Sequence, residues 1–132
     1  MDKYGGSNED FEYIFGSRNI DEAYDQVSRY CKTMIYTKNT EGVDVISDGK
    51  KYHFPVKKIQ PVSTIGAGDN FNAGTIAALY RLGIHASNLT ELRENQWGEI
   101  INDAVNFASD VCMSYENYVS TAFASEYKSS KL

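Results

Sequence analysis

A glycine-rich segment, residues 61–74, carries the residue types best suited to chemistry; it reads Pro-Val-Ser-Thr-Ile-Gly-Ala-Gly-Asp-Asn-Phe-Asn-Ala-Gly. Gly66 and Gly68 allow a tight turn, and the amides of Ala67, Gly68 and Asp69 at the start of a helix can point at an anion. The Asp69 carboxylate beside such a turn could accept a hydroxyl proton during phosphoryl transfer. The same pattern also fits plain helix capping, with Asp69 as a favourable partner of the helix dipole.

The elements that would position this segment predict an α/β fold. Apolar residues at helical spacing predict a short helix at 11–15 after the cap-rich run 7–10. A second helix, capped by Asp21, would place Tyr24, Val27 and Tyr30 or Cys31 on one stripe. The apolar run 33–37 predicts a buried strand, and the alternating segments 43–47 and 51–55 around Asp48-Gly49 predict a hairpin.

Two helices are predicted after the glycine-rich segment. The first runs from Phe71 and ends at Gly83, and the second is amphipathic over 97–115. The Ser- and Lys-rich segment 120–132 is expected to be a peripheral tail. We therefore treat 1–132 as a single, partial domain, because the predicted sheet is small.

Composition narrows the function classes. The chain has 132 residues and a formal net charge of -5, which argues against nucleic acid as a partner. It contains no apolar run long enough to cross a membrane and no secretory signal, so a cytoplasmic location is expected. Cys31 and Cys112 are expected to be buried thiols, and His53 and His85 lack the neighbours of a metal site.

The spacing of Gly66, Gly68 and Gly74 matches neither a Walker A loop nor a dinucleotide-binding turn. The segment 63–74 instead resembles the second signature of the ribokinase-like (phosphofructokinase B, pfkB) carbohydrate kinases, D-T-T-G-A-G-D-x-F-x-x-G. Upstream, 37–42 resembles the family's T-x-G-x-x-G turn over the nucleotide, and 54–56 its F-P-V segment. The run 7–11 is similar to the N-x-x-E motif, and 107–109 is similar to a helix beside the adenine pocket.

The resemblance implies a partial ribokinase-like fold, a three-layer α/β/α arrangement of which this chain is the C-terminal, nucleotide-binding portion. It implies an ATP- and Mg²⁺-dependent transfer of the γ-phosphoryl group to a sugar or nucleoside hydroxyl. The implied catalytic groups are the base Asp69 and an anion hole formed by the amides of Gly66, Ala67 and Gly68. The implied nucleotide contacts are Thr37, Asn39, Gly42 and Ser109, and Asp10 would reach magnesium indirectly, through water.

Some positions depart from the family pattern. Ser63 and Ile65 replace residues that the family uses around a monovalent cation, so the resemblance does not imply that ion. The sugar-recognition half has no counterpart in the chain. Two alternatives therefore stay open: a non-catalytic nucleotide-binding module or remnant, and a structural domain whose turn binds nothing. An acceptor site completed across a homodimer is a further alternative.

Overall fold

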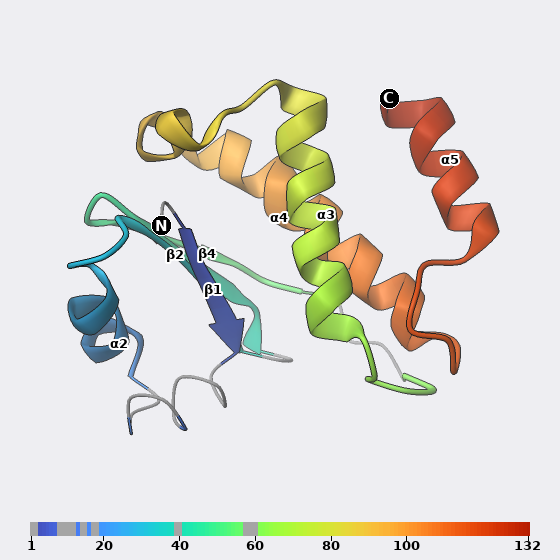
Figure 1. Cartoon of the computed structure of the whole chain (residues 1–132), viewed down its shortest axis with the longest axis horizontal. Coiled ribbons are helices and arrows are strands. Elements are labelled where there is room, and N and C mark those ends of the chain that lie inside the picture. Colours follow the sequence, from blue (N-terminus) through green and yellow to red (C-terminus); the bar gives the residue numbers. More distant parts are fainter. Residues whose placement is uncertain (1–2, 8–12, 14–15, 17–18, 39–40, 57–60) are drawn as a thin grey trace. The chain divides into compact units, whose positions relative to one another are not determined.

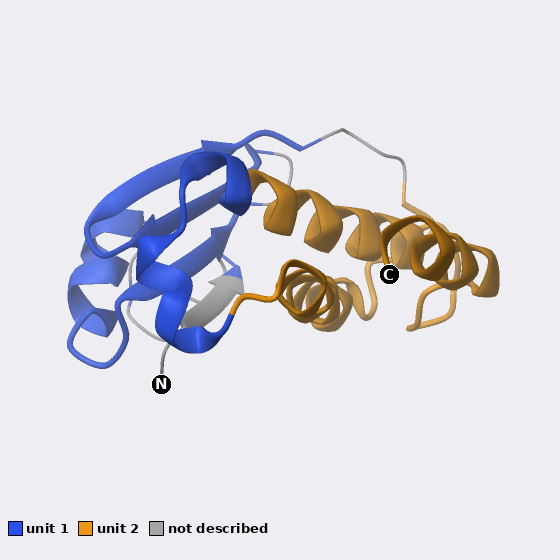
Figure 2. Ribbon diagram, turned by 90° about the horizontal axis from the view of Figure 1, so that it is seen from above, with its two compact units in different colours: residues 1–57, 85–97 blue, residues 58–84, 98–132 orange. Residues whose placement is uncertain are grey.

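The computed structural model describes residues 3–7, 13, 16, 19–38, 41–56 and 61–132. The chain divides into two compact units, and the predicted α/β class is confirmed. Unit 1 comprises residues 1–57 and 85–97, and unit 2 comprises residues 58–84 and 98–132 (Figure 2).

Unit 1 contains a four-stranded sheet in the order β1-β2-β3-β4. Strands β1, β2 and β4 are labelled in Figure 1. Strand β1 (Lys3–Ser7) pairs in parallel with β2 (Thr33–Thr37), whereas β3 (Val43–Ser47) and β4 (Lys50–Phe54) continue the sheet in antiparallel pairing. The predicted buried strand and hairpin are confirmed. Asp48 and Gly49 form the hairpin turn with φ of 50° and 80°, the left-handed conformation that an Asp-Gly pair adopts readily.

The first strand was not expected from the sequence. Ser7, which we placed in the cap-rich start of a helix, is the last residue of β1 and pairs with Thr37. Two glycines and no β-branched residue make β1 a weak strand by propensity, and pairing with the buried strand β2 overrides that preference. The helix predicted at 11–15 falls mainly on residues outside those that the structure describes.

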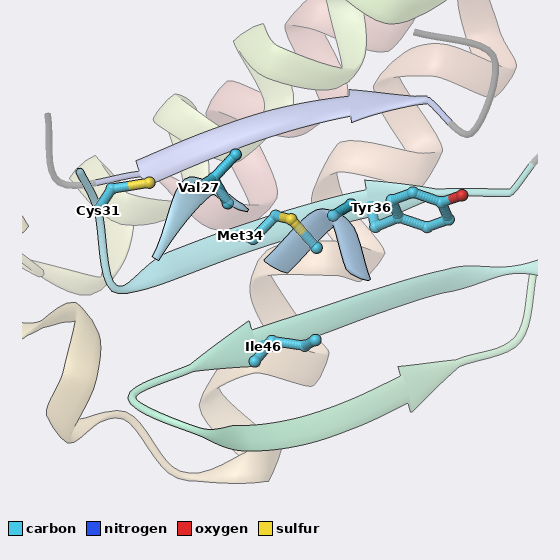
Figure 3. Close-up of a cluster of buried hydrophobic side chains, with 6 residues drawn as sticks. Val27, Cys31, Met34, Tyr36 and Ile46 are labelled. Atoms are coloured by element: carbon cyan, nitrogen blue, oxygen red, sulfur yellow. The ribbon is translucent and has the colours of Figure 1, made fainter. Parts of the chain in front are cut away.

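Helix α2 (Ile20–Val27) packs on one face of this sheet. Its N-cap is Asn19 and not Asp21, because the Asn19 side chain accepts hydrogen bonds from the amides of Asp21 and Glu22 at 2.9 and 3.2 Å. Of the two residues expected as alternatives at the end of the buried stripe, Cys31 is buried and Tyr30 is exposed. The core of this face comprises Ala23, Val27, Cys31, Met34, Tyr36 and Ile46, most of which are labelled in Figure 3.

The opposite face of the sheet is also covered. Thr33 and Ser47, opposite each other on β2 and β3, share a buried hydrogen bond of 2.8 Å. The Ser47 hydroxyl also donates a hydrogen bond of 3.2 Å to the carbonyl oxygen of Leu89. Leu89 belongs to the 3-10 helix η2 (Ala86–Glu91). Both central strands are therefore buried on both faces, which explains why β2 reads as a compact apolar run. Strand β3 is buried as well, although Asp44 and Ser47 give it an alternating pattern in the sequence.

Unit 2 contains α3 (Ala67–Leu82), residues 98–112 of α4 (Glu94–Cys112), and α5 (Thr121–Lys131). The two predicted helices are confirmed, and α3 ends at Gly83 with φ 67°, as expected of a glycine cap. Helices α3 and α4 approach closely at Gly74, where an added Cβ would lie 2.7 Å from the Cα of Ala104 and 2.9 Å from the Asp103 carbonyl oxygen. Gly74 is thus the contact that sets the spacing of these helices.

The carboxylate of Asp103 joins all three helices of unit 2. This side chain is fully buried, and it accepts hydrogen bonds from Arg81 on α3 at 3.0 and 3.2 Å. On α5 its partners are the Tyr127 hydroxyl and the Lys131 ammonium, each at 2.8 Å. Burial raises the pKa of Asp103, but the hydrogen bonds from Lys131, Tyr127 and Arg81 outweigh it and hold the pKa below its usual range.

The segment 120–132, for which the composition indicates a peripheral tail, forms helix α5, and most of its side chains are exposed. Its N-cap, Ser120, is held by the Asp110 carboxylate, which accepts hydrogen bonds from the Ser120 amide at 2.7 Å and hydroxyl at 3.0 Å. Tyr127 is buried, and its ring meets that of Phe107 edge-on with centroids 5.1 Å apart. Helix α5 therefore packs against α4 through specific contacts at its N-cap and at Tyr127.

Both cysteines are free and buried, as predicted. Burial raises the pKa of the Cys112 thiol, which keeps it protonated at neutral pH. Among the helices that the structure describes, none combines the length and the hydropathy needed to span a bilayer.

Replacing Asp103 by Asn should lower the free energy of unfolding at pH 7 by about 3 kcal/mol or more, because Arg81 and Lys131 lose a buried counter-charge. The pKa of Asp103 is lower in the folded than in the unfolded chain. Its contribution is therefore present above about pH 4 and is lost as the pH falls through the folded-state value. Urea denaturation should show the two proteins converging in acid.

The matched control is Glu99→Gln, because this exposed carboxylate lies 3.7 Å from the same guanidinium of Arg81. We expect it to change the unfolding free energy by less than about 1 kcal/mol. Equal losses in Asp103→Asn and Glu99→Gln would contradict the assigned role of the buried carboxylate.

Gly74→Ala should destabilise the chain by about 1–3 kcal/mol, because the new methyl group meets the backbone of α4. Gly68→Ala, in the same helix, provides the comparison: an added Cβ there meets nothing within 4 Å, so stability should be unchanged or slightly higher. Thermal denaturation followed by circular dichroism measures both. If Gly74→Ala were as stable as Gly68→Ala, the close approach of α3 and α4 would be wrong.

Candidate functional site

The glycine-rich turn at the start of α3 depends on Gly66. This residue is the N-cap of α3 with φ 83° and ψ 0°, a left-handed conformation that favours glycine. An added Cβ at Gly66 would also lie 3.0 Å from the Cβ of Asn117 and 3.1 Å from its Cα. Both the backbone conformation and the space available therefore exclude a larger residue.

Hydrogen bonds from the rest of unit 2 hold this turn in place. The amides of Val62 and Ser63 donate to the carbonyl oxygen of Cys112 at the end of α4, at 2.8 and 3.2 Å. The Asn70 side-chain amide donates to the carbonyl oxygens of Gly66 and Asn117, both at 2.9 Å. The turn is thus fixed by the end of α4 and by the connection that leads from α4 to α5.

The start of α3 leaves two amides open. No side chain caps this helix, the Ala67 amide donates to the carbonyl oxygen of Thr64 at 3.2 Å, and the Asn70 amide donates to that of Gly66 at 3.0 Å. Within the part of the chain that the structure describes, the amides of Gly68 and Asp69 have no acceptor. Of the three amides predicted to face an anion, Ala67 therefore has an internal partner, whereas Gly68 and Asp69 are available.

The Asp69 carboxylate belongs to the same turn and is exposed. A negative side chain in the first turn of a helix is stabilised by the helix dipole, and the free amides beside it attract anions. One short segment therefore presents a proton acceptor and hydrogen-bond donors side by side. This arrangement can bind an anionic group and remove a proton from a hydroxyl next to it.

The second predicted element, the connection between β2 and β3, lies in unit 1. Thr37 is the last residue of β2, and Gly42 precedes β3 with φ 104°. The amide of Lys38 donates to the carbonyl oxygen of Gly42 at 2.9 Å, which closes the connection. A Cβ on Gly42 would lie 2.6 Å from the carbonyl oxygen of Phe54, so this position has no room for a side chain.

A buried acid beside this connection was missed by the sequence analysis. Asp44 on β3 is 2% exposed, and its carboxylate pairs with Lys38 and with His53 on β4. Burial raises the pKa of Asp44, but the hydrogen bonds and charges of Lys38 and His53 outweigh this effect and lower it. The available signal was a carboxylate at a buried position of an otherwise apolar strand.

The remaining predicted site residues are distributed as follows. Ser109 is half-buried on α4 in unit 2, the unit that also holds the Gly66–Asp69 turn. Asn39 and Asp10 lie outside the described residues. The structure therefore brings together the residues at 66–69 in one turn, and it places Thr37 and Gly42 at the two ends of another connection.

Two curated proteins illustrate the sequence similarity. A fructokinase from Klebsiella pneumoniae is 35% identical over 80 residues, which cover 59% of this chain and 26% of that protein. A nucleoside kinase from Thermoplasma acidophilum is 46% identical over 48 residues, covering 36% of this chain and 16% of that protein. The matched part of the chain thus spans about a quarter or less of these relatives.

Solved structures share the fold. Adenosine kinase from Sinorhizobium meliloti matches 98% of this chain and 36% of its own length, with a TM-score of 0.72 and 19% identity. Aminoimidazole riboside kinase from Salmonella enterica, solved with aminoimidazole riboside and an ATP analogue, matches 87% of this chain and 37% of its own length, with a TM-score of 0.69 and 21% identity. The expectation of a partial ribokinase-like fold is confirmed.

The family model described as pfkB family carbohydrate kinase matches residues 6–120, which include the open turn at the start of α3 and the β2–β3 connection. This match covers most of the chain and agrees with the resemblance noted for residues 63–74. The chain belongs to the pfkB family of carbohydrate kinases.

Proposed function

We propose that this chain is the nucleotide-binding part of an ATP-dependent kinase that phosphorylates a hydroxyl of a sugar or a nucleoside. The observation that carries the proposal is the first turn of α3, where the open amides of Gly68 and Asp69 stand beside the exposed Asp69 carboxylate. A phosphoryl group and the hydroxyl that attacks it need these two functions at one place.

The similar proteins support this class of reaction. The relatives are a fructokinase and a nucleoside kinase, and a fructokinase from Vibrio cholerae was solved with fructose, ADP and a calcium ion. Sugars and nucleosides both offer hydroxyl groups as acceptors. The proposed acceptor class is therefore a sugar or a nucleoside.

In the proposed reaction, the acceptor oxygen forms a bond to the γ-phosphorus of ATP while the bond from that phosphorus to the bridging oxygen of ADP breaks. Asp69 takes the hydroxyl proton, and amides of the 66–69 turn donate hydrogen bonds to the oxygens of the phosphoryl group. Thr37, Asn39, Gly42 and Ser109 would contact the nucleotide. Magnesium, when bound, would neutralise charge on the nucleotide phosphates, with Asp10 acting through water.

The second candidate is a nucleotide-binding module without catalysis. It is favoured by Ser63, which stands where the family signature has Asp and whose hydroxyl accepts the Ile65 amide at 3.2 Å, forming a local turn. In such a module Asp69 would only stabilise the start of α3. The two candidates differ in the consequence of removing the Asp69 carboxylate.

The chain should bind MgADP weakly, at roughly millimolar dissociation constant (about -4 kcal/mol), because the phosphate turn is built and the chain covers only 36–37% of the length of the similar kinases. Gly68→Val should weaken this binding first, since a β-branched side chain would project where the phosphates approach. Ala73→Val introduces the same side chain at an exposed position of α3 away from the turn and should leave binding unchanged. Calorimetry measures all three, and no heat with the unaltered chain would remove the proposal.

In a form of the protein that includes an acceptor-binding portion, Asp69→Asn should lower kcat by about 10²–10⁴-fold while nucleotide affinity stays nearly constant. The physical reason is that Asn keeps the size of Asp but cannot take a proton. Asp25→Asn, an exposed carboxylate on α2, is the matched control and should leave kcat unchanged. A kcat within about threefold for Asp69→Asn would favour the non-catalytic module.

A further inference from the structure

Asp44 occupies a position where an apolar side chain is expected. Its strand neighbours across β2 and β4 are Tyr36 and His53, and the same sheet face carries Met34 and Ile46 in the core under α2. Placing a carboxylate in such surroundings is costly unless it is paired and hydrogen-bonded. The carboxylate of Asp44 is therefore better explained by the side chains that it binds than by packing in the core.

The two oxygens of Asp44 have different partners. Lys38 Nζ lies 2.9 Å from Oδ2, and His53 Nδ1 lies 2.5 Å from Oδ1. Because the carboxylate is ionised, it can only accept, so both partners donate. Both partners are more exposed than Asp44: 24% of the Lys38 side chain and 49% of the His53 side chain remain accessible.

These partners lie at the two ends of the β2–β3 connection. Lys38 directly follows β2, where its carbonyl oxygen also accepts the amide of Glu41 at 3.0 Å. His53 lies against the other end: a Cβ added to Gly42 would be 2.9 Å from the His53 ring. The buried carboxylate of Asp44 thus fixes the Lys38 side chain at the start of the connection and the His53 ring that lies against Gly42 at its end.

We propose that Asp44 is a positioning residue for nucleotide binding, which holds Lys38 and His53 and thereby fixes both ends of the β2–β3 connection. This inference rests on the proposed function, in which Thr37 and Gly42 contact the nucleotide. The Lys38 ammonium is engaged by Asp44, so its role is to anchor the connection and not to contact phosphate. Binding by backbone groups needs such fixing, because a mobile segment loses entropy when it is ordered by the ligand.

The test is an NMR titration of the chain with MgADP, comparing the unaltered protein with Asp44→Asn and with the control Asp21→Asn. Asp21 is an exposed carboxylate on α2, 3.7 Å from Lys51, and its removal should change nothing. Asp44→Asn should raise the dissociation constant about tenfold, the effect of losing a charged hydrogen-bond partner worth about 1.4 kcal/mol. Before ligand is added, the amides of Lys38 and Glu41 should also exchange faster in Asp44→Asn, while those of the Asp48-Gly49 turn should not.

A second variant, Lys38→Met, separates positioning from direct contact and does not alter the buried position. If Lys38 acts through Asp44, Lys38→Met and the double variant Lys38→Met/Asp44→Asn should each have the same dissociation constant for MgADP as Asp44→Asn. Lys38→Arg, which keeps the positive charge, should bind MgADP as tightly as the unaltered chain. Additive losses in the double variant would overturn the inference, because Lys38 and Asp44 would then act separately. Equal affinity of Asp44→Asn and the unaltered chain would remove this inference alone, whereas no binding by any of the proteins would remove the proposed function with it.

Discussion

The buried carboxylate of Asp103 is the constraint on which the geometry of unit 2 depends. It sits on α4, yet its partners come from the last turn of α3 and from α5, so one charge fixes the separation and rotation of three helices. Gly74 lets α3 approach the same stretch of α4 without a side chain between them. Helix α3 is consequently held at both ends: Arg81 in its last turn binds Asp103, and Asn70 in its first turn binds the carbonyl oxygen of Asn117.

A buried, hydrogen-bonded carboxylate is also found in unit 1, where it holds a different kind of element. There the buried carboxylate of Asp44 lies within a sheet and reaches outward to Lys38 and His53, beside the connection that precedes β3. In both units an ionised acid is tolerated because hydrogen bonds satisfy it from several elements at once. Each buried acid therefore fixes the relative positions of the elements that supply its partners, and Asp44 does so beside the β2–β3 connection.

The features that depend on local sequence were predicted, whereas those that depend on contacts between distant residues were not. Glycines mark both ends of α3, and Asp48-Gly49 marks the hairpin, because those backbone conformations disfavour most other residues. Strand β1 and the N-cap Asn19 were missed, since the first depends on pairing with a strand about 30 residues away and the second competed with a neighbouring Asp. The Asp103 network was equally invisible, because one of its partners is 28 residues distant in sequence. The partners of Asp44 are nearer in sequence, but only the register of the sheet places His53 opposite it.

In the proposed function, the open turn of α3 receives the phosphates of a nucleotide. The most direct measurement is the change in the backbone amide resonances of Gly68 and Asp69 when MgADP is added, with magnesium alone as the reference. We expect large, saturable shifts at these two amides, and smaller ones at Ala67, whose amide already donates to the carbonyl oxygen of Thr64. Shifts confined to other parts of the chain, with Gly68 and Asp69 unmoved at saturation, would contradict it.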